Sequence, residues 1–506
     1  MAERVRRTAT LWRDTVRLPE YDRLRSNAEA DVCVVGAGIA GLATAYLLAA
    51  EGRSVLVLDD GPLAGGETGN TTAHLATAWD DRFHELEKLF DAESARLVAE
   101  SHGAAIAAIA RIAEQEGIDC DFRYLDGYLF PGTDGDVDAL RKEERAARAA
   151  GLDVALVEPP FDPFHTGPAL RFARQAAFHP LKWVAGVARA IEARGGRICT
   201  NTKVSAIHGG APVTVETAGG VKVTAGACVV ATNAAISDMV QTHAKSAPYR
   251  TFVVVLEVPR DAVPDALYWD DSDPYTYIRL QRGGAHDWLI VGGEDYKTGQ
   301  ESDDAERLER LEAWTRTRFP MAGALTHRWS GQVVEPDDTV AFIGRNPDGA
   351  DNVYIIMGDS GQGMTHGVLG GLLLTDLIQG RENPWAKLYD PRRISAGAAS
   401  EYLKQNLNVV AQFADWLKPG EVRSPDEVPA GCGRLMRRGT SILALYRDPD
   451  GFVHERSAVC THMKCIVQWN DLEKSWDCPC HGSRFSPLGE VLNGPAVAEL
   501  KLPDTE

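Results

Sequence analysis

The sequence predicts an α/β domain near the amino end and a small all-β domain at the carboxyl end. Residues 30–50 run from a short apolar strand through a glycine-rich turn into an Ala/Leu-rich helix. From about residue 425, short strands alternate with turns such as residues 448–451. Because 506 residues exceed what one hydrophobic core usually holds, we expect two or three domains.

The chain is strongly acidic, with a formal net charge of -19 at pH 7. Nucleic acids and anionic membrane surfaces are bound mainly through cationic faces, so this charge disfavours both as partners. Residues 1–25 contain no apolar run that could serve as a signal peptide, and no later stretch has the apolar length of a bilayer span. We therefore expect a cytoplasmic protein with no membrane span and no nucleic-acid partner.

The glycine-rich turn has the spacing of a dinucleotide site, because Gly36, Gly38 and Gly41 form a Gly-x-Gly-x-x-Gly motif. The first glycine allows the tight turn, the second lets a pyrophosphate approach the backbone, and the third packs the helix against the strand. The next strand, residues 54–58, ends in Asp59, at about the 20-residue distance expected of an acid that binds ribose hydroxyls. These residues predict a pyrophosphate on the amino terminus of the helix.

Further loops favour FAD over NAD as the dinucleotide. The small-residue loop 65–74 follows soon after Asp59, and a simple NAD domain does not require it. The strand at residues 353–357 runs into a glycine-rich helix start, whose dipole suits the electron-rich N1/C2 carbonyl edge of a flavin. The candidate FAD contacts in these loops, and after the strand at residues 227–230, are Thr71, Thr72, Thr232, Gly358, Gly363 and Met364.

Two half-sites near the carboxyl end offer two thiolates and two imidazoles, from Cys460, His462, Cys478 and His481. This ligand set holds a Rieske 2Fe-2S cluster, with the cysteines on one iron and the histidines on the other. Zinc also takes two Cys and two His, but zinc sites usually keep each pair together, whereas here each half-site contributes one of each. We predict a Rieske cluster; zinc or a purely structural cysteine cluster is the alternative.

The two half-sites resemble the ligand loops of the Rieske proteins of cytochrome bc complexes. Residues 494–496, Gly-Pro-Ala, are similar to the proline loop that covers the cluster in that family. Cys465 and Cys480 lie one in each half-site. The resemblance implies a disulfide between them that joins the two ligand loops.

The chain as a whole resembles the FAD-dependent oxidoreductases of the D-amino-acid-oxidase-like superfamily, in the bacterial branch with a Rieske domain at the carboxyl end. The likeness runs from residues 11–15 through the flavin loops and residues 383–392 to the cluster loops. It implies an α/β, Rossmann-like FAD-binding domain, an α+β substrate domain on an antiparallel sheet, and an all-β Rieske domain. The expected division is 1–84, 176–239 and 331–394 for FAD binding, 85–175 and 240–330 for substrate, 395–424 for a linker with a helix, and 425–506 for the Rieske domain.

The candidate substrate residues come from one strand and from the loops near the flavin. On the predicted strand 274–281, alternation puts Tyr275, Tyr277 and Arg279 on one face. Over a flavin this face could hold a carboxylate or another polar substrate, or it could be an ordinary half-exposed sheet face. The candidate catalytic residues are Tyr277, Arg279, His74 and His366.

Some positions depart from the pattern of the family. Where its amino-acid oxidases carry an arginine for the substrate carboxylate, this chain has Gln332 after Trp-Ser-Gly. That change argues against an α-amino acid as the substrate. Four further positions differ from the Rieske-bearing relatives and suggest a specialised substrate: Asn70, His74, Gln362 and His366.

These features predict an enzyme, an FAD-dependent oxidoreductase of a small metabolite. We expect oxidation at the C–N bond of an amine or amino-acid-like compound, with hydride transfer to flavin N5. Two histidine ligands raise a Rieske potential to roughly -150 to +300 mV, so the cluster is a downhill one-electron sink for a reduced flavin. The sequence does not decide whether the outside electron acceptor is oxygen, a quinone or a redox protein. The alternative is an electron-transfer flavoprotein that supplies an oxygenase or quinone, although the chain has no second nucleotide motif for NAD(P)H.

Overall fold

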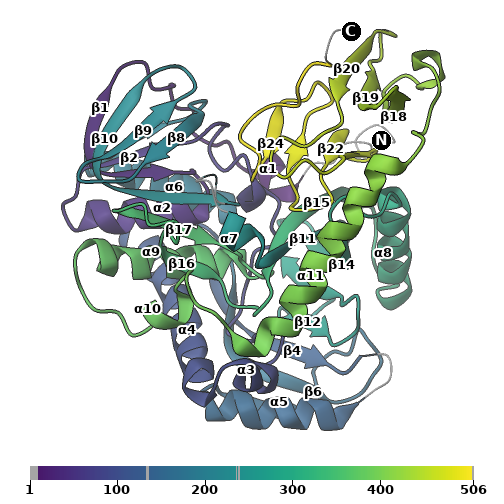
Figure 1. Cartoon of the computed structure of the whole chain (residues 1–506). Helices are drawn as coiled ribbons and strands as arrows, with labels where there is room; N and C mark the ends of the chain where they lie inside the picture. Colours follow the sequence, from purple (N-terminus) through teal and green to yellow (C-terminus); the bar gives the residue numbers. More distant parts are fainter. Residues whose placement is uncertain (1–9, 133–135, 235, 237–239, 504–506) are drawn as a thin grey trace.

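The structure, a computed structural model, describes residues 10–132, 136–234, 236 and 240–503. The outer ends of the predicted first and last domains, residues 1–9 and 504–506, lie outside the described residues. Figure 1 shows a parallel sheet on the left, a larger sheet toward the lower right and short strands at the top near the carboxyl end. The expected three kinds of domain are therefore all present.

The first sheet has the strand order β16-β17-β10-β1-β2-β7. The pairs among β17, β10, β1, β2 and β7 are parallel, while β16 and the β8–β9 hairpin attach in antiparallel orientation. Helices cover these strands, which explains why β2 is apolar throughout. The bounds are β1 (Ala28–Val35), β2 (Val55–Leu58), β7 (Arg197–Cys199), β8 (Val204–His208), β9 (Val213–Thr217), β10 (Lys222–Asn233), β16 (Phe342–Arg345) and β17 (Val353–Met357).

Helices α2 (Ile39–Ala50), α6 (Pro180–Ala193) and α9 (Gly363–Ile378) belong to this α/β domain. Helix α2 is apolar on nearly every side because α6 and α9 both pack against it. Helix α4 (Ala92–Gln115) packs against α9 in turn. None of the helices in the described part of the chain is long and apolar enough to cross a bilayer.

The second sheet has the order β15-β11-β14-β13-β12-β4-β6-β3, with β5 on β6. All its pairs are antiparallel except β12 with β4, so the expected antiparallel sheet is confirmed with one parallel pair. The strand bounds are β3 (His74–Leu75), β4 (Arg123–Phe130), β5 (Val154–Val157), β6 (Ala169–Ala177), β11 (Ser246–Val258), β12 (Leu267–Asp270), β13 (Tyr277–Gln281), β14 (Asp287–Lys297) and β15 (Leu325–Pro336). Its helices are α3 (Phe83–Leu89), α5 (Val137–Ala149) and α8 (Asp304–Arg318).

Three of the predicted domain boundaries fall inside elements of this sheet unit. The boundary at residue 84 lies within α3, the boundary at residue 176 lies within β6, and the boundary at residue 331 lies within β15. The chain therefore passes between the first two domains a few residues away from those positions. We keep the division into domains as a proposal.

The carboxyl-terminal domain has two small antiparallel sheets, ordered β18-β19-β20 and β21-β22-β23-β24. Its own apolar core includes Trp476, Phe485 and Cys460. The bounds are β18 (Cys432–Arg438), β19 (Ser441–Arg447), β20 (Val453–Ser457), β21 (Gln468–Asn470), β22 (Ser475–Asp477), β23 (Arg484–Phe485) and β24 (Val491–Asn493).

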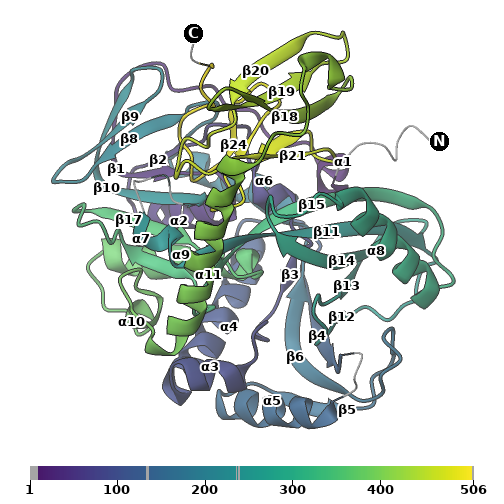
Figure 2. The same ribbon diagram turned by 45° about the vertical axis from the view of Figure 1, so that its right-hand side comes forward.

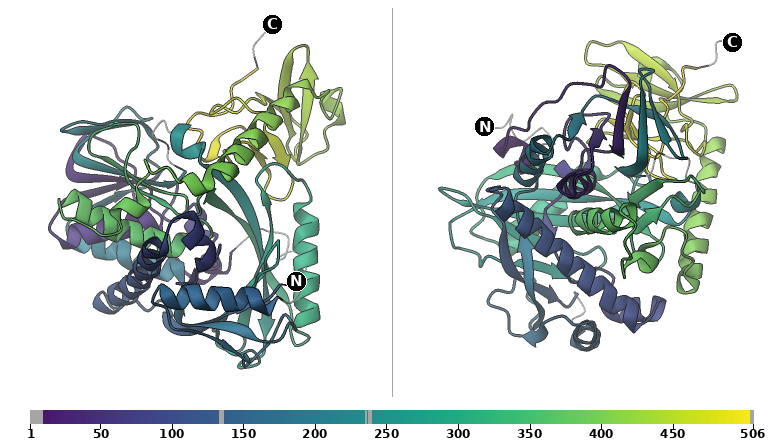
Figure 3. Two further views of the ribbon diagram at one scale, coloured as in Figure 1. Left: turned by 60° about the horizontal axis from the view of Figure 1, so that its bottom comes forward. Right: turned by 90° about the vertical axis from the view of Figure 1, so that its left-hand side faces the viewer.

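Helix α11 (Ala399–Gln412) leads from the neighbourhood of α3 to the carboxyl-terminal strands, as Figures 2 and 3 show. Apolar side chains recur at helical spacing in residues 409–417, and this spacing predicts a face that docks on the α/β domain. Instead, Val409 and Trp416 pack against the core of the carboxyl-terminal domain. Val410 and Leu417 are 63% and 86% exposed. Helical spacing identifies the apolar side chains of residues 409–417, but the surface that each side chain contacts depends on how the domains pack.

Candidate functional site

A cavity of about 610 Å³ opens where the three groups of strands meet. The α/β domain contributes Gly36 and Asp59 to its lining, and the second sheet contributes Tyr277. The carboxyl-terminal domain adds Asn493 and Gly494. One space therefore touches the predicted dinucleotide motif, the predicted substrate residues and the predicted cluster domain.

The glycine motif folds so tightly that larger residues do not fit. A Cβ at Gly36 would lie 2.4 Å from the carbonyl oxygen of Ala231, and one at Gly41 would lie 1.9 Å from the carbonyl oxygen of Gly36. Gly36 also has φ +111°, which favours glycine. Gly36 and Gly38 line the cavity, while Gly41 lies beneath the turn and packs the helix. This arrangement fits the close approach of a pyrophosphate.

Asp59 lines the same end of the cavity and also supports the turn. Its Oδ2 accepts a hydrogen bond from the N–H of Ala37 at 2.6 Å, and its Oδ1 accepts one from Gly61 at 2.9 Å. Burial raises the pKa of this carboxyl to about 6. The acid is thus held at the cavity wall by the backbone of the motif itself.

Helices α2 and α9 both begin at the cavity, and their N-cap residues, Gly38 and Gln362, make no side-chain cap bond. In α2, the N–H of Ile39 donates to Oγ1 of Thr68 at 3.0 Å. Such helix starts favour groups with negative charge or acceptor oxygens. Of the other candidate FAD residues, Thr71, Thr72, Thr232, Gly363 and Met364 line the cavity. Gly358 does not line it, because it lies against the ring of Pro336. The tight glycine turn and the two helix starts at the cavity fit FAD.

His74 and Tyr277 face each other across the cavity wall, with ring centroids 5.6 Å apart. His74 Nδ1 lies 3.0 Å from the hydroxyl of Thr72, and the Tyr277 hydroxyl lies 2.7 Å from that of Thr251. Burial lowers the pKa of His74 to about 3 and raises the pKa of Tyr277. Both side chains are therefore neutral near pH 7 and act as hydrogen-bonding groups.

His366 lines the cavity at the start of α9. Its Nδ1 lies 2.9 Å from the carbonyl oxygen of Asp359, and its Nε2 lies 3.2 Å from Nε2 of His102. Burial lowers the pKa of His366 to about 4. His102 is a partner that no sequence motif identified.

Arg279 does not reach the cavity, contrary to the expectation for a catalytic residue. Its side chain is fully buried and donates to the carbonyl oxygens of Thr72, Ala73 and Phe178 at 3.2, 2.7 and 3.1 Å. Alternation correctly gives Arg279 the face of Tyr277, but β13 runs away from the cavity after Tyr277. Arg279 therefore supports the loop that carries Thr72 and His74.

The four predicted cluster ligands come together in the carboxyl-terminal domain. The rings of His462 and His481 have centroids 5.1 Å apart. The thiols of Cys460 and Cys478 lie in hydrogen-bond contact, which lowers the pKa of Cys460 to about 7. His481 Nδ1 is buried without a hydrogen-bond partner in the described part of the chain. Two adjacent sulfurs, two adjacent imidazoles and one unmet ring nitrogen fit a 2Fe-2S cluster.

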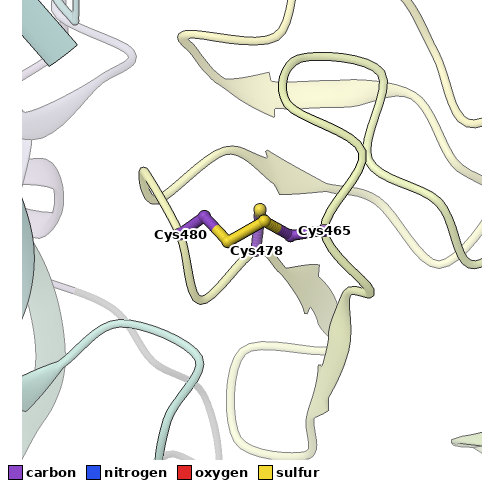
Figure 4. Close-up of side chains that lie close together, drawn as sticks. All are labelled: Cys465, Cys478 and Cys480. Atoms are coloured by element: carbon purple, nitrogen blue, oxygen red, sulfur yellow. A yellow bond between two sulfur atoms is a disulfide. The ribbon is translucent and has the colours of Figure 1, made fainter. Parts of the chain in front are cut away.

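Cys465 and Cys480 form a disulfide, drawn in Figure 4. The sulfurs of Cys465, Cys478 and Cys480 all lie within 4.8 Å of one another. Because two of these sulfurs are bonded to each other, only Cys478 keeps a thiol that can bind metal. The disulfide joins the two ligand loops, as the resemblance implied.

The cluster loops rest directly on the wall of the cavity. Gln332 Nε2 donates to the carbonyl oxygen of Gly482 at 3.0 Å. Glu67 accepts from the N–H of Gln332 at 2.8 Å and from Asn493 Nδ2 at 3.1 Å. The ring of His243 lies 5.4 Å from that of His462. Glu67 belongs to the loop 65–74 and Gln332 is a departure from the family pattern, but neither feature indicates a contact with the Rieske domain, and His243 lies in no motif. This contact therefore had no signal in the sequence.

Comparison with known proteins agrees with this geometry. Residues 31–377 match the family of FAD dependent oxidoreductases (DAO), and residues 418–504 match the Rieske [2Fe-2S] domain. The Rieske 2Fe-2S iron-sulfur protein YhfW of Bacillus subtilis (strain 168) is 29% identical over 502 residues, 98% of each chain. Gamma-glutamylputrescine oxidoreductase of Escherichia coli (strain K12) is 28% identical over 393 residues, which cover 71% of this chain and 86% of that one.

A solved structure shows the same fold. Glycine oxidase from Geobacillus kaustophilus superposes with a TM-score of 0.60 at 19% identity, over 72% of this chain and 100% of that chain. The predicted fold class, FAD, the 2Fe-2S cluster and the assignment as an enzyme are confirmed. The chain belongs to the family of FAD dependent oxidoreductases, and a Rieske domain with a 2Fe-2S cluster follows its catalytic part.

Proposed function

We propose that this enzyme oxidises a C–N bond of an amine or amino-acid-like metabolite by hydride transfer to flavin N5, and that the electrons pass singly to its own cluster. The observation that carries the proposal is the shared cavity, which residues of the flavin loops, the substrate sheet and the Rieske domain line together. The C–N bond is supported by the E. coli relative, whose name describes the oxidation of an amine.

When bound, FAD supplies a two-electron hydride acceptor and the cluster supplies a one-electron carrier. The residues of the chain position the reaction and exclude water. His74, Tyr277 and His366 are neutral, so they line the substrate space without placing a charge beside the substrate. We propose these three as the site residues and leave Arg279 out of the catalytic set, because it does not reach the cavity.

The Rieske domain is held against the cavity by buried contacts. Gln332 lines the cavity and is only 4% exposed, and its amide reaches the loop that follows His481. Glu67 ties the same wall to Asn493 of the Rieske domain. Such contacts favour electron transfer from flavin to cluster within one molecule. An outside acceptor, which is oxygen, a quinone or a redox protein, then takes the electrons from the cluster.

A screen of metabolites under anaerobic conditions tests the proposal. The holoenzyme is mixed with a panel of primary and secondary amines, amino acids and hydroxy acids, and the flavin absorption is followed. We expect at least one amine-bearing compound to bleach the flavin. If a hydroxy acid bleaches it and no compound with a C–N bond does, the assignment to C–N oxidation is wrong.

A further inference from the structure

Carboxylates gather at the end of the cavity where the substrate sheet approaches the start of α9. Asp80 lines the cavity; Asp295 and Glu335 do not line it, but they lie near enough to Asp80 for the charges to interact. Burial, with a further contribution from the charge of Asp80, raises the pKa of Asp295 to about 7. Burial and the neighbouring carboxylates also raise the pKa of Glu335. This end of the cavity therefore holds several acids that repel one another when ionised.

No basic side chain of the cavity lining balances these acids. Among the described residues that line the cavity, the basic ones are Lys203 and Arg484. Lys203 lies at the Asp59 end, next to Thr202, whose N–H bonds to the carbonyl oxygen of Asp59. Arg484 is paired with Asp477 of the Rieske domain at 3.1 Å. The acidic end is thus open to a cation that comes from outside the chain.

Arg82, which follows the acids in sequence, is also engaged elsewhere. Its guanidinium pairs with Asp271 at 2.5 Å and bonds to the backbone carbonyl of Asp80, and it does not line the cavity. It lowers the pKa of Asp80 only in part: burial, with the charge of Asp81, still raises that pKa to about 7.

A residue of the same wall, Gln362, carries an unmet acceptor. Gln362 lines the cavity and is 8% exposed. Its Nε2 donates to the carbonyl oxygen of Ala78 at 2.5 Å and to Oδ1 of Asp80 at 3.3 Å. Both partners are acceptors, which fixes the orientation of the amide. Its Oε1 is left buried without a hydrogen-bond partner in the described part of the chain, and so is Oδ1 of Asp295.

The walls suit the alkyl part of a cation. The rings of Tyr275 and Tyr277 lie 5.4 Å apart, and Trp269 also lines the cavity. A Cβ at Gly361 would meet Oδ2 of Asp80 at 2.7 Å and the hydroxyl of Tyr275 at 3.7 Å, so both groups face the same point. Aromatic faces attract organic cations and cover apolar stems.

We propose that Asp80 and Gln362 bind a positively charged amino group of the substrate, so that the substrate class is a cationic alkylamine without a carboxylate at that end. An ammonium group supplies both the charge and the N–H donors that the unmet acceptors require. A carboxylate would bring a second negative charge and no donor. This inference rests on the proposed function and names the substrate class of the same site.

Binding to the oxidised holoenzyme tests the inference without turnover. Butylguanidine, a cation with N–H donors, and butanoate, an anion with a similar chain, are titrated separately while the flavin absorption spectrum is recorded. We expect saturable binding of butylguanidine and binding of butanoate that is at least about ten-fold weaker, the factor expected for a charge-assisted hydrogen bond. Equal binding of the two, or tighter binding of butanoate, would overturn the inference.

Matched variants locate the effect. Asp80→Asn keeps the side-chain size and removes the charge, and Gln362→Met removes the unmet acceptor; each should weaken butylguanidine binding about ten-fold. Asp450→Asn makes the same charge change on an exposed turn of the Rieske domain, away from the cavity lining, and should change butylguanidine binding less than about two-fold. If Asp80→Asn and Gln362→Met bind butylguanidine as the wild type does, the inference fails. The FAD content and Tm of each variant show that it is folded, and each of the two variants tests the site separately.

The two proposals fail in different ways. If butylguanidine binding depends on Asp80 but no compound with a C–N bond reduces the flavin, the cation site stands and the C–N assignment falls. If α-amino acids reduce the flavin as fast as butane-1,4-diamine does, in which one amino group can be held as a cation while the other is oxidised as the free amine, the C–N assignment stands and the cation site falls.

Discussion

Replacement of Arg279 by methionine separates a supporting role from a catalytic one. Arg279 donates to three buried carbonyl oxygens, those of Thr72, Ala73 and Phe178. Methionine fills a similar space but offers no donor. The three carbonyls would then lie buried without their partner, and the loop that carries His74 would lose its support.

The cost follows from these bonds. A buried polar group that loses its partner costs about 1–3 kcal/mol, so three carbonyls give at least roughly 3 kcal/mol before relaxation. Burial lowers the pKa of Arg279 to about 9, which shows that the buried cation is itself disfavoured, and its removal offsets part of the loss. We expect a net loss of about 3 kcal/mol, equivalent to a fall in Tm of about 6 °C at ~2 °C per kcal/mol.

Thermal unfolding of the holoenzyme, followed by calorimetry and by release of FAD, measures this loss. Arg282→Met is the control, because the Arg282 side chain is 64% exposed and its pair with Asp265 lies at the surface. The control should change Tm by less than about 2 °C. If Arg279→Met keeps the wild-type Tm and FAD content but loses binding of the substrate, Arg279 is a substrate ligand and its supporting role is wrong.

Three further predictions concern the cofactor sites and the acidic end of the cavity. Gly41→Ala should lower the ratio of bound FAD to protein, because the added Cβ would lie 1.9 Å from the carbonyl oxygen of Gly36. Gly103→Ala is the control, because a Cβ at Gly103 meets open space and should leave the ratio unchanged. Equal FAD ratios in the two variants would contradict the role of the glycine turn in FAD binding. Cys478→Ser should abolish the electron paramagnetic resonance (EPR) signal of the reduced cluster and leave FAD bound, whereas Cys432→Ser should keep both; loss of FAD from Cys478→Ser would show that the domains depend on each other. Butylguanidine should bind more tightly as pH rises from 6 to 8, because the pKa of Asp80 is about 7 and its carboxylate forms over that range. Asp80 is faced by Asp81, Arg82, Tyr275 and Gln362, and it also interacts with Asp295 and Glu335; the pKa of Asp295 is about 7 too, so its ionisation adds to the rise. Affinity that is flat or falls with pH would exclude Asp80 as the anion.

The features that the sequence predicts well are local ones. Gly36, Gly38 and Gly41 are required by a turn of a few residues, so their spacing alone identifies it. The same holds for the cluster loops, in which each pair of ligands lies within a few residues. Side-chain alternation on β13 also gave the right face for Tyr277 and Arg279. It could not show where along the strand the cavity ends, and so it placed Arg279 in the wrong surroundings.

The features that the sequence did not reveal depend on contacts between distant segments. Glu67 and Gln332 are 265 positions apart, and Gln332 and Gly482 are 150 apart. Each is a single polar residue, and its role exists only after the three domains have packed. In the sequence Gln362 is a departure from the family, but its unmet oxygen is a property of the folded amide and its two acceptor partners.

The central claim is that the flavin and the cluster form one relay within the molecule. The most direct test is rapid anaerobic mixing of the holoenzyme with an amine that bleaches the flavin, followed by freezing at successive times for EPR. We predict that flavin reduction comes first and that the signal of the reduced cluster then rises without any added carrier, at a rate independent of protein concentration. In Cys478→Ser the first phase should remain and the second should be absent. A wild-type cluster that stays oxidised beside a fully reduced flavin would contradict the relay.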